Sequence, residues 1–230
     1  MNEKIEPGSN FFCKAVIFDM DGTLVDSTKA DFLAWQKLFA HYNKHLSFDE
    51  YVPLLGIKSS QVVRDFLPVN NDEELQFALS QKLVFFHEII SENGIYPVPF
   101  ADVFLMQIKR LNIPVALATS SRRAKMEMVM EKLNLLIYFD TVVTGGDVKM
   151  GKPSPDIFLK AAESLNVFPG DCIVFEDAAN GVKAAHNAGM KCVALASHQT
   201  TESLHEADLV IDTFENLSFP NVCFRIQETV

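Results

Sequence analysis

Six short runs of hydrophobic residues are spread along the chain, and each is apolar almost throughout instead of alternating with polar residues. Such runs, rich in β-branched side chains, are typical of strands that are buried on both faces of a parallel sheet. The pattern therefore predicts six strands, over 14–19, 114–120, 140–145, 171–177, 191–195 and 207–212.

Segments with helical spacing of their apolar positions fill the intervals between these runs. The clearest of them cover 103–111, 123–133, 154–165 and 178–189. The alternation of strands and helices predicts an α/β fold with a doubly wound parallel sheet. In such a sheet the active site lies beyond the carboxyl ends of the strands, at the point where the strand order reverses.

The interval from about Thr28 to Asn93 breaks this alternation, because it contains helical patterns and no strand-like run. It is too long for a single crossover between neighbouring strands. We interpret it as a helical cap over 28–94, inserted into a core formed by 1–27 and 95–230, rather than as a helical layer lying on the sheet. Such a cap needs an apolar cluster of its own. The residues that can supply one are Leu33, Trp35, Phe39, Leu79, Leu83 and Phe86.

Composition narrows the classes of partner. The 230 residues are 48% hydrophobic, which is ample for a packed core, and the formal net charge is −10. Binding to a nucleic-acid backbone needs a basic face and is not expected. The first ten residues hold no apolar run, and no stretch approaches the roughly 18 consecutive apolar residues of a membrane helix. We therefore expect a cytoplasmic protein without nucleic-acid or membrane partners, and a monomer.

A pair of acids follows the first predicted strand, in the segment DMDGTLVDS at 19–27. Asp19 and Asp21 lie two residues apart, and Gly22 lets the loop curl so that both carboxylates enter one pocket. A carboxylate that attacks phosphorus forms an aspartyl-phosphate and divides a slow hydrolysis into two easier steps. A second acid can protonate the leaving alkoxide and later activate water. The competing interpretation is ordinary turn chemistry at the end of a strand.

A second pair of acids, Glu176 and Asp177, ends the strand predicted over 171–177. In a doubly wound sheet these acids share a crevice with Asp19 and Asp21. Carboxylates that face one another repel, and a divalent cation relieves the repulsion. Ligands that are all oxygens select Mg²⁺. Asp177 can also cap the helix that follows, with or without a metal.

Two further strand ends carry groups that bind phosphate. Lys152 precedes a helix start, where backbone N–H groups and the helix dipole favour an anion, and its ammonium can neutralise the nucleophile. Thr119 and Ser120 end another strand and can donate hydrogen bonds to phosphate, as can Ser121 and Arg122 beyond them. Each signal is weak alone. Together the four strand ends supply the positioning, charge neutralisation and acid–base help that phosphoryl transfer needs.

At these residues the chain resembles the haloacid dehalogenase superfamily. The match runs through DMDGT, Thr119, Lys152 and Glu176-Asp177 in that order, across nearly the whole chain. It is closest to members with a helical cap after the first strand, namely β-phosphoglucomutase-like proteins and phosphoglycolate-type phosphatases. The resemblance implies a core sheet ordered 5-4-1-2-3, with the active site between core and cap.

The resemblance also implies a ligand set for Mg²⁺. The ligands would be the side chain of Asp19, the backbone carbonyl of Asp21 and the side chain of Asp177. Glu176 would act through water or as an outer ligand. In the cap, Gly56 and Lys58 lie in the segment LLGIKSS, where the family places substrate contacts.

Three enzymatic functions and one non-enzymatic function compete on this basis. A dehalogenase needs neither a leaving-group acid nor a metal, so Asp21 counts against it. The sugar-phosphate mutases of the family carry an Arg shortly after the cap Gly and a His in the first cap helix. Here Ser59 and Asp31 stand at those places, which favours a phosphatase over a mutase. The remaining alternative is a receiver-like module that binds Mg²⁺ without turnover. The sequence thus predicts a Mg²⁺-dependent phosphatase that acts on a small phosphorylated metabolite through an aspartyl-phosphate.

Overall fold

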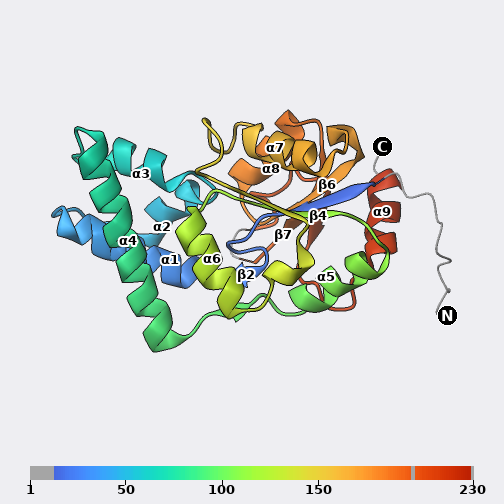
Figure 1. The fold of residues 1–230 in the computed structure, drawn as a ribbon, viewed down its shortest axis with the longest axis horizontal. Coiled ribbons are helices and arrows are strands. Elements are labelled where there is room, and N and C mark those ends of the chain that lie inside the picture. The colour runs from blue at the N-terminus through green and yellow to red at the C-terminus, as the bar shows by residue number, and fades with distance from the viewer. Residues whose placement is uncertain (1–12, 198–199, 229–230) are drawn as a thin grey trace.

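The computed structural model describes residues 13–197 and 200–228, and a six-stranded parallel sheet forms its centre (Figure 1). The strands lie in the order β5-β4-β1-β6-β7-β8, so the order reverses at β1. The six predicted strands and the doubly wound α/β class are therefore confirmed. Strands β7-β6-β1-β4-β5 form the predicted order 5-4-1-2-3, and β8 is added outside β7. The bounds are β1 (Ala15–Phe18), β4 (Val115–Thr119), β5 (Thr141–Thr144), β6 (Cys172–Glu176), β7 (Lys191–Leu195) and β8 (Leu209–Ile211).

Two hydrophobic clusters cover the two faces of the sheet, and β1 contributes to both. Successive side chains of a strand point to opposite faces. Val16 and Phe18 accordingly join one cluster, whereas Ala15 and Ile17 join the other. This double burial is the reason that the strand is apolar at every position. The register Phe18↔Leu117 and Phe18↔Phe175 brings the carboxyl ends of β1, β4 and β6 level with one another.

Helices pack on both faces of the sheet (Figure 1). The first cluster includes side chains from α5, α6 and α9, and the second includes side chains from α7 and α8. The four predicted helices correspond to α5–α8, and only α9 was not foreseen. The bounds are α5 (Ala101–Arg110), α6 (Arg123–Lys132), α7 (Asp156–Leu165), α8 (Ala179–Asn187) and α9 (Phe219–Glu228), with short 3₁₀ helices at Val52–Leu54, Leu136–Tyr138 and Pro169–Asp171.

The segment after β1 is helical, as the sequence predicts, and consists of α1 (Thr28–His41), α2 (Phe48–Tyr51), α3 (Ser59–Phe66) and α4 (Asp72–Asn93). A third hydrophobic cluster lies within it and contains Trp35, Phe39 and Leu79. Phe86 and Leu33, expected in that cluster, instead pack against the core. For Phe86 the reason is the length of α4, whose 22 residues span about 33 Å, so that its second half joins the core cluster. The separate cluster supports the proposed cap over 28–94.

A two-stranded antiparallel pair joins the ends of this helical segment. It is formed by β2 (Val25–Asp26) before α1 and β3 (Tyr96–Pro97) after α4. Strands of two residues are too short to show a hydrophobic period, so the sequence did not reveal them. The pair ties the two connections between cap and core side by side.

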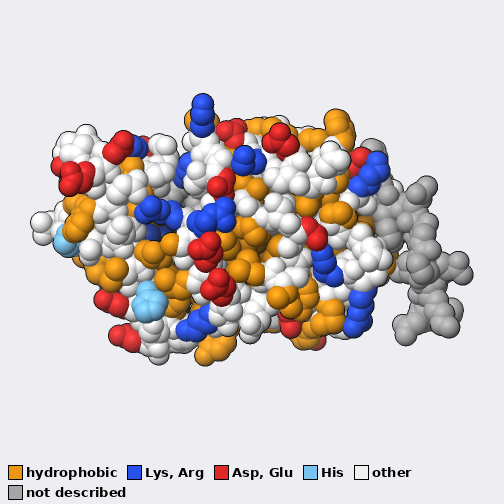
Figure 2. Space-filling view, in the orientation of Figure 1, with side chains coloured by type: hydrophobic (Ala, Val, Ile, Leu, Met, Phe, Trp, Pro, Cys, Tyr) orange, Lys and Arg blue, Asp and Glu red, His pale blue; other side chains and the backbone are white. Residues whose placement is uncertain are grey.

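The surface is mixed in character. On the face shown in Figure 2, Lys and Arg side chains are interspersed with acidic and apolar ones. Such mixing is ordinary for a folded domain, because apolar atoms make up much of any protein surface. None of the described helices has the length and apolar character needed to cross a membrane.

Phe104 of α5 ties the sheet to its helices, and its replacement tests the packing. Its buried ring lies 5.2 Å from Phe175 and 5.2 Å from Phe214, measured between centroids. We expect Phe104→Ala to lower the free energy of unfolding by about 3–5 kcal/mol in urea titrations, because it leaves a cavity. The matched control is Phe224→Ala on α9, whose ring is 61% exposed. We expect the control to change stability by less than about 0.5 kcal/mol; equal losses would contradict the assigned core.

Candidate active site

The predicted site residues meet where the carboxyl ends of the central strands meet. Asp19 follows β1, Thr119 ends β4 and Glu176 ends β6. The backbone N–H of Asp19 donates to the carbonyl of Phe175 at 2.9 Å, which fixes the start of the acidic loop against β6. Asp19, Thr119 and Asp177, the residue after β6, border a cavity of about 50 Å³ between the sheet and the helical segment. The location is the reversal point of the strand order, as expected for a doubly wound sheet.

Lys152 forms the floor of the site. Its ammonium lies 2.5 Å from Oδ1 of Asp19 and also contacts Oε1 of Glu176, and its side chain is fully buried. The ring of Phe158 lies beneath it, 4.9 Å from Nζ to the ring centroid. Burial alone would lower the pKa of Lys152, but the charges of Asp19 and Glu176 outweigh burial and raise it. Lys152 is therefore a fixed cation behind the nucleophile candidate.

Negative charge exceeds positive charge at this floor. Burial raises the pKa of Asp19 to about 7, with Lys152 opposing the shift and Glu176 adding to it. Burial also raises the pKa of Asp177 well above its usual range, and the charges of Glu176 and Asp19 add to that rise. Three buried carboxylates thus share one ammonium, and a further cation would relieve the repulsion.

The donor set fits a hard divalent cation. Asp19, Asp177 and the backbone carbonyl of Asp21 offer oxygen atoms alone, which is what Mg²⁺ prefers. Among the described residues, no three acidic, His or Cys side chains converge to hold a metal by themselves. Glu176 is engaged elsewhere, because Oε2 accepts the backbone N–H groups of Asp177 and Ala178 at 2.8 Å each. These hydrogen bonds fit a residue that supports the loop after β6 rather than one that binds a metal directly.

Glycine at position 22 is required by the close approach of Asp177. Gly22 has φ of +83°, and a Cβ there would lie 2.0 Å from Oδ2 of Asp177. Gly181 makes similar room for Glu176, since its Cβ would lie 1.9 Å from Oε1. Both carboxylates are therefore pressed against backbone that carries no side chain.

The hydroxyl groups after β4 have three different partners. Oγ1 of Thr119 accepts the backbone N–H of Ser121 at 3.1 Å and keeps its own proton to donate. Ser120 donates to the carbonyl of Gly56 at 2.6 Å, which links the core to the helical segment. Ser121 donates to Oδ2 of Asp21 at 2.6 Å. All three residues and Gly56 line the cavity, as the sequence predicts.

Arg122 and Lys58, which were expected to bind substrate, do not line this cavity. Arg122 donates to Oε1 of Gln76 at 2.8 Å, and Lys58 donates to the carbonyl of Val148 at 2.9 Å. Both border a neighbouring cleft of about 190 Å³. Their side chains turn away because side-chain and backbone oxygens of adjacent segments, including the carbonyl of Lys149, hold them there.

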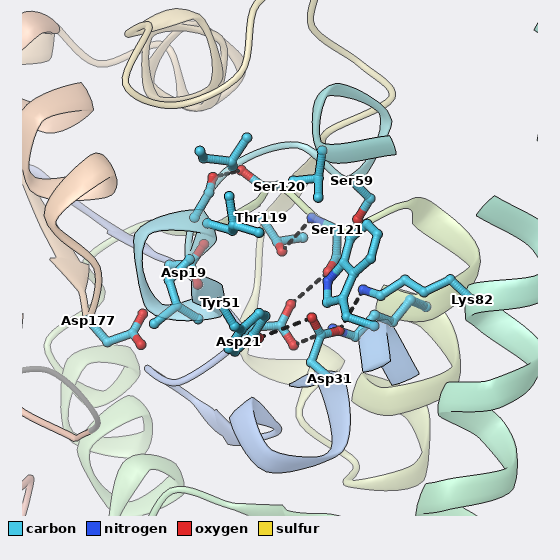
Figure 3. A pocket seen from close by; sticks show the side chains of 17 residues that line it. Asp19, Asp21, Asp31, Tyr51, Ser59, Lys82, Thr119, Ser120, Ser121 and Asp177 are labelled. Carbon is cyan, nitrogen blue, oxygen red and sulfur yellow. Dashed lines mark hydrogen bonds and ion pairs between the residues drawn. The ribbon is translucent and has the colours of Figure 1, made fainter. Parts of the chain in front are cut away.

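Five polar residues of the cavity, Ser59 among them, were not among the predicted site residues (Figure 3). Asp31 accepts hydrogen bonds from Lys82 at 2.8 Å, from Lys125 at 2.7 Å and from Tyr51 at 3.2 Å. Lys125 also donates to Oδ1 of Asp21 at 2.8 Å. Burial by itself would raise the pKa of Asp31, but Lys125 and Lys82 outweigh it and lower that pKa.

The sequence did contain a signal for three of these residues. Asp31 precedes Ala34, Trp35 and Leu38 on the buried face of α1, at helical spacing. Lys82 and Lys125 occupy similar positions among the buried residues of α4 and α6. A charged side chain where the helical period expects an apolar one indicates a buried partner. The pattern does not say which partner.

Known proteins resemble this chain in both sequence and fold. The family model described as haloacid dehalogenase-like hydrolase matches residues 16–195. Fructose-1-phosphate phosphatase YqaB of Escherichia coli is 33% identical over 178 residues, which cover 77% of this chain and 94% of that protein. Beta-phosphoglucomutase of Bacillus subtilis is 32% identical over 233 residues, covering 94% and 99%. The crystal structure of beta-phosphoglucomutase from Clostridium difficile has a TM-score of 0.83 at 29% identity, covering 94% and 98%.

Replacement of Gly22 tests the contact with Asp177. We expect Gly22→Ala to lower the free energy of unfolding, measured in urea, by more than the control Gly189→Ala. Gly189 also has positive φ, +72°, but a Cβ there would meet nothing within 4 Å. The control should therefore lose only about 1–2 kcal/mol, from backbone strain.

A second background separates strain from contact. When Asp177 is replaced by Gly, the excess loss of Gly22→Ala over Gly189→Ala should disappear, because the two side chains no longer collide. An excess that persists in that background would show that the contact with Asp177 is not its cause.

Proposed function

Because the chain belongs to the haloacid dehalogenase-like hydrolases, and so is a phosphatase or a mutase, we propose that it is a Mg²⁺-dependent phosphatase. Its substrate is a small phosphorylated sugar or related metabolite, and the reaction passes through an aspartyl-phosphate. The observation that carries the proposal is the buried ammonium of Lys152, 2.5 Å from Oδ1 of Asp19 at the cavity floor. A carboxylate held there by a fixed cation is oriented as a nucleophile toward a phosphoryl group.

Asp19, Asp21 and Thr119, which line the cavity, act with the buried Lys152 behind Asp19 in the two halves of the reaction. An oxygen of Asp19 attacks phosphorus, and the bond from phosphorus to the leaving oxygen breaks. Lys152 holds the charge of the nucleophile, and the hydroxyl of Thr119 donates to a phosphoryl oxygen. Asp21 gives a proton to the leaving oxygen and later removes one from the water that attacks phosphorus. In that second step the bond from phosphorus to Asp19 breaks, and inorganic phosphate and the free Asp19 carboxylate are released. When bound, Mg²⁺ supplies positive charge beside the phosphoryl oxygens.

The state of the nearby cations favours a phosphatase over a mutase. A mutase has to hold a second phosphate on the same sugar, which calls for a free cation on the cap side. Lys82 and Lys125 are both paired with Asp31, and Lys58 and Arg122 are bound to neutral oxygens. In the part of the chain that the structure describes, the cavity thus offers no unpaired Lys or Arg for a second phosphate.

Phosphate release from a panel of phosphomonoesters tests the function. We expect release with Mg²⁺ present and without any added bisphosphate, since water is the final acceptor. Asp19→Asn should lower the rate at least about 1,000-fold while the fold survives, because the amide cannot form the covalent ester. The control Asp102→Asn, on the exposed surface of α5, should keep full activity.

Other outcomes have distinct meanings. Dependence on a bisphosphate activator would identify a mutase. Magnesium binding without turnover of any ester would favour the receiver-like module. Substantial activity in folded Asp19→Asn would remove Asp19 as the nucleophile.

Removal of the metal is a separate prediction. We expect a chelator to stop phosphate release and added Mg²⁺ to restore it. Magnesium should also raise the melting temperature, because a ligand that binds only the folded state stabilises it. Asp177→Asn should lose most of that rise, since it removes one of the carboxylates that create the surplus charge. Full activity in chelator would exclude the metal from the reaction.

A further inference from the structure

A chain of four charged side chains runs from the core into the cap, and we call it the charged bridge. It consists of Asp21, Lys125, Asp31 and Lys82. Nζ of Lys125 lies 2.8 Å from Oδ1 of Asp21 and 2.7 Å from Oδ1 of Asp31. Nζ of Lys82 lies 2.8 Å from the same oxygen of Asp31. Lys125 therefore connects an acid of the catalytic loop to an acid of the cap.

The charged bridge draws on four different segments. Asp21 lies in the loop after β1, and Lys125 lies in the first turn of α6, so both belong to the core. Asp31 comes from α1 and Lys82 from α4, which are cap helices. Figure 3 shows Asp21 with Asp19 and Asp177 on one side and with Asp31 and Lys82 on the other. The bridge thus crosses the boundary between cap and core at the cavity.

Burying these charged side chains costs free energy, because they lose their hydration. The side chains of Lys125, Lys82 and Asp31 are 7%, 8% and 12% exposed. Two ammonium groups balance two carboxylates, and the rings of Phe86 and Trp35 lie under the two lysines. Such a network is satisfied, yet apolar side chains of similar volume are often at least as stabilising. Stability is therefore a poor explanation for the bridge, and orientation of Asp21 is a better one.

Asp21 is held by three donors. Oδ1 accepts from Ser27 at 2.5 Å and from Lys125, and Oδ2 accepts from Ser121 at 2.6 Å. Together they fix the rotation of the carboxylate in the loop. Ser27, the residue before α1, and Ser121, just beyond β4, are buried neutral donors. Of the three, Lys125 is the one that Asp31 anchors to the cap helices.

We propose that Lys125 is a positioning residue for Asp21, and that Asp31 holds Lys125 in place. Through the charged bridge, the orientation of the Asp21 carboxylate depends on how α1 and α4 pack against α6. This inference rests on the proposed function, in which Asp21 gives a proton to the leaving oxygen. Lys125 neither gives nor takes a proton in that step: the bond from phosphorus to oxygen breaks, and the proton that the oxygen gains comes from Asp21.

The choice of ester separates a positioning role from a general loss of activity. An alkoxide leaves only with a proton, whereas p-nitrophenolate leaves readily without one. A misaligned Asp21 should therefore slow the hydrolysis of alkyl phosphates far more than that of p-nitrophenyl phosphate. A variant that merely loosens the fold would slow both to the same degree.

The main variant is Lys125→Met, which keeps the length of the side chain and removes its charge. We expect kcat for an alkyl phosphate from the active panel to fall about 10- to 100-fold, because misplaced catalytic groups lose rate on that scale. We expect kcat for p-nitrophenyl phosphate to fall less than about 3-fold, with KM for both esters little changed. Lys125→Arg should recover much of the alkyl rate, since a guanidinium can bridge two carboxylates.

Coupling to Asp21 provides the second measurement. In an Asp21→Asn background, which itself should show the ester-dependent loss, Lys125→Met should cause no additional loss, because the group that it positions is gone. The matched control is Lys37→Met on α1, whose lysine forms an exposed pair with Glu88. Lys37→Met should leave kcat unchanged for both esters.

A charge-balanced variant guards against misfolding. Lys125→Met leaves two carboxylates with one buried ammonium, whereas Asp31→Asn combined with Lys125→Met leaves one of each. The double variant should show the same ester-dependent loss in a folded protein.

The outcomes separate the two proposals. Equal falls on both esters in an active enzyme, or losses that add to those of Asp21→Asn, would overturn the role of Lys125 alone. Absence of phosphate release by the unmodified protein would overturn the proposed function and this inference with it. If Lys125→Met slows the alkyl ester selectively, and has no further effect in the Asp21→Asn background, both proposals are supported.

Discussion

The ion pairs of Lys152 with Asp19 and Glu176 are the interaction on which the rest of the site depends. Removal of the ammonium would leave carboxylates out of water without compensation, which is strongly destabilising. The surroundings are shaped by the same requirement. Glu176 takes two backbone N–H groups, and Gly22 leaves room for the carboxylate of Asp177. The carboxyl end of the sheet thus buries more carboxyl groups than ammonium groups in one place.

The two sides of the cavity differ in how their charges balance. At the strand ends, three buried carboxylates share the ammonium of Lys152, which leaves a need for a further cation. At the boundary with the cap, the charged bridge pairs two carboxylates with two lysines and is satisfied without one. Positive charge from outside the chain is therefore favoured beside Asp19 and not beside Asp31. Under the proposed function, this asymmetry would separate phosphoryl transfer at the sheet from proton transfer at the boundary.

The fold and the sheet side of the site were predictable because their signals are local. The strands are largely apolar runs, and an acid or hydroxyl ends or directly follows β1, β4 and β6, so order along the chain gives position in space. The charged bridge was not predictable, since Asp31, Lys82 and Lys125 come from three helices that are distant in sequence. Each showed a charge on an apolar helix face, but the pattern does not identify partners. Arg122 and Lys58 lie beside the cavity for a reason that no motif marks, because their partners are an amide and backbone carbonyls.

Positions 31 and 125 constrain each other through charge. With Asp31 in place, loss of Lys125 leaves Asp21 and Asp31 with one ammonium; with Lys125 in place, loss of Asp31 leaves two ammonium groups facing Asp21. Either single change leaves the buried network with unequal numbers of positive and negative charges. The charge balance therefore needs both residues. Asp31 is paired with both lysines that line the cavity, Lys82 and Lys125. The feature that fixes Asp21 therefore also withholds those cations from a second phosphate, so one arrangement accounts for both features on which the proposed phosphatase activity rests.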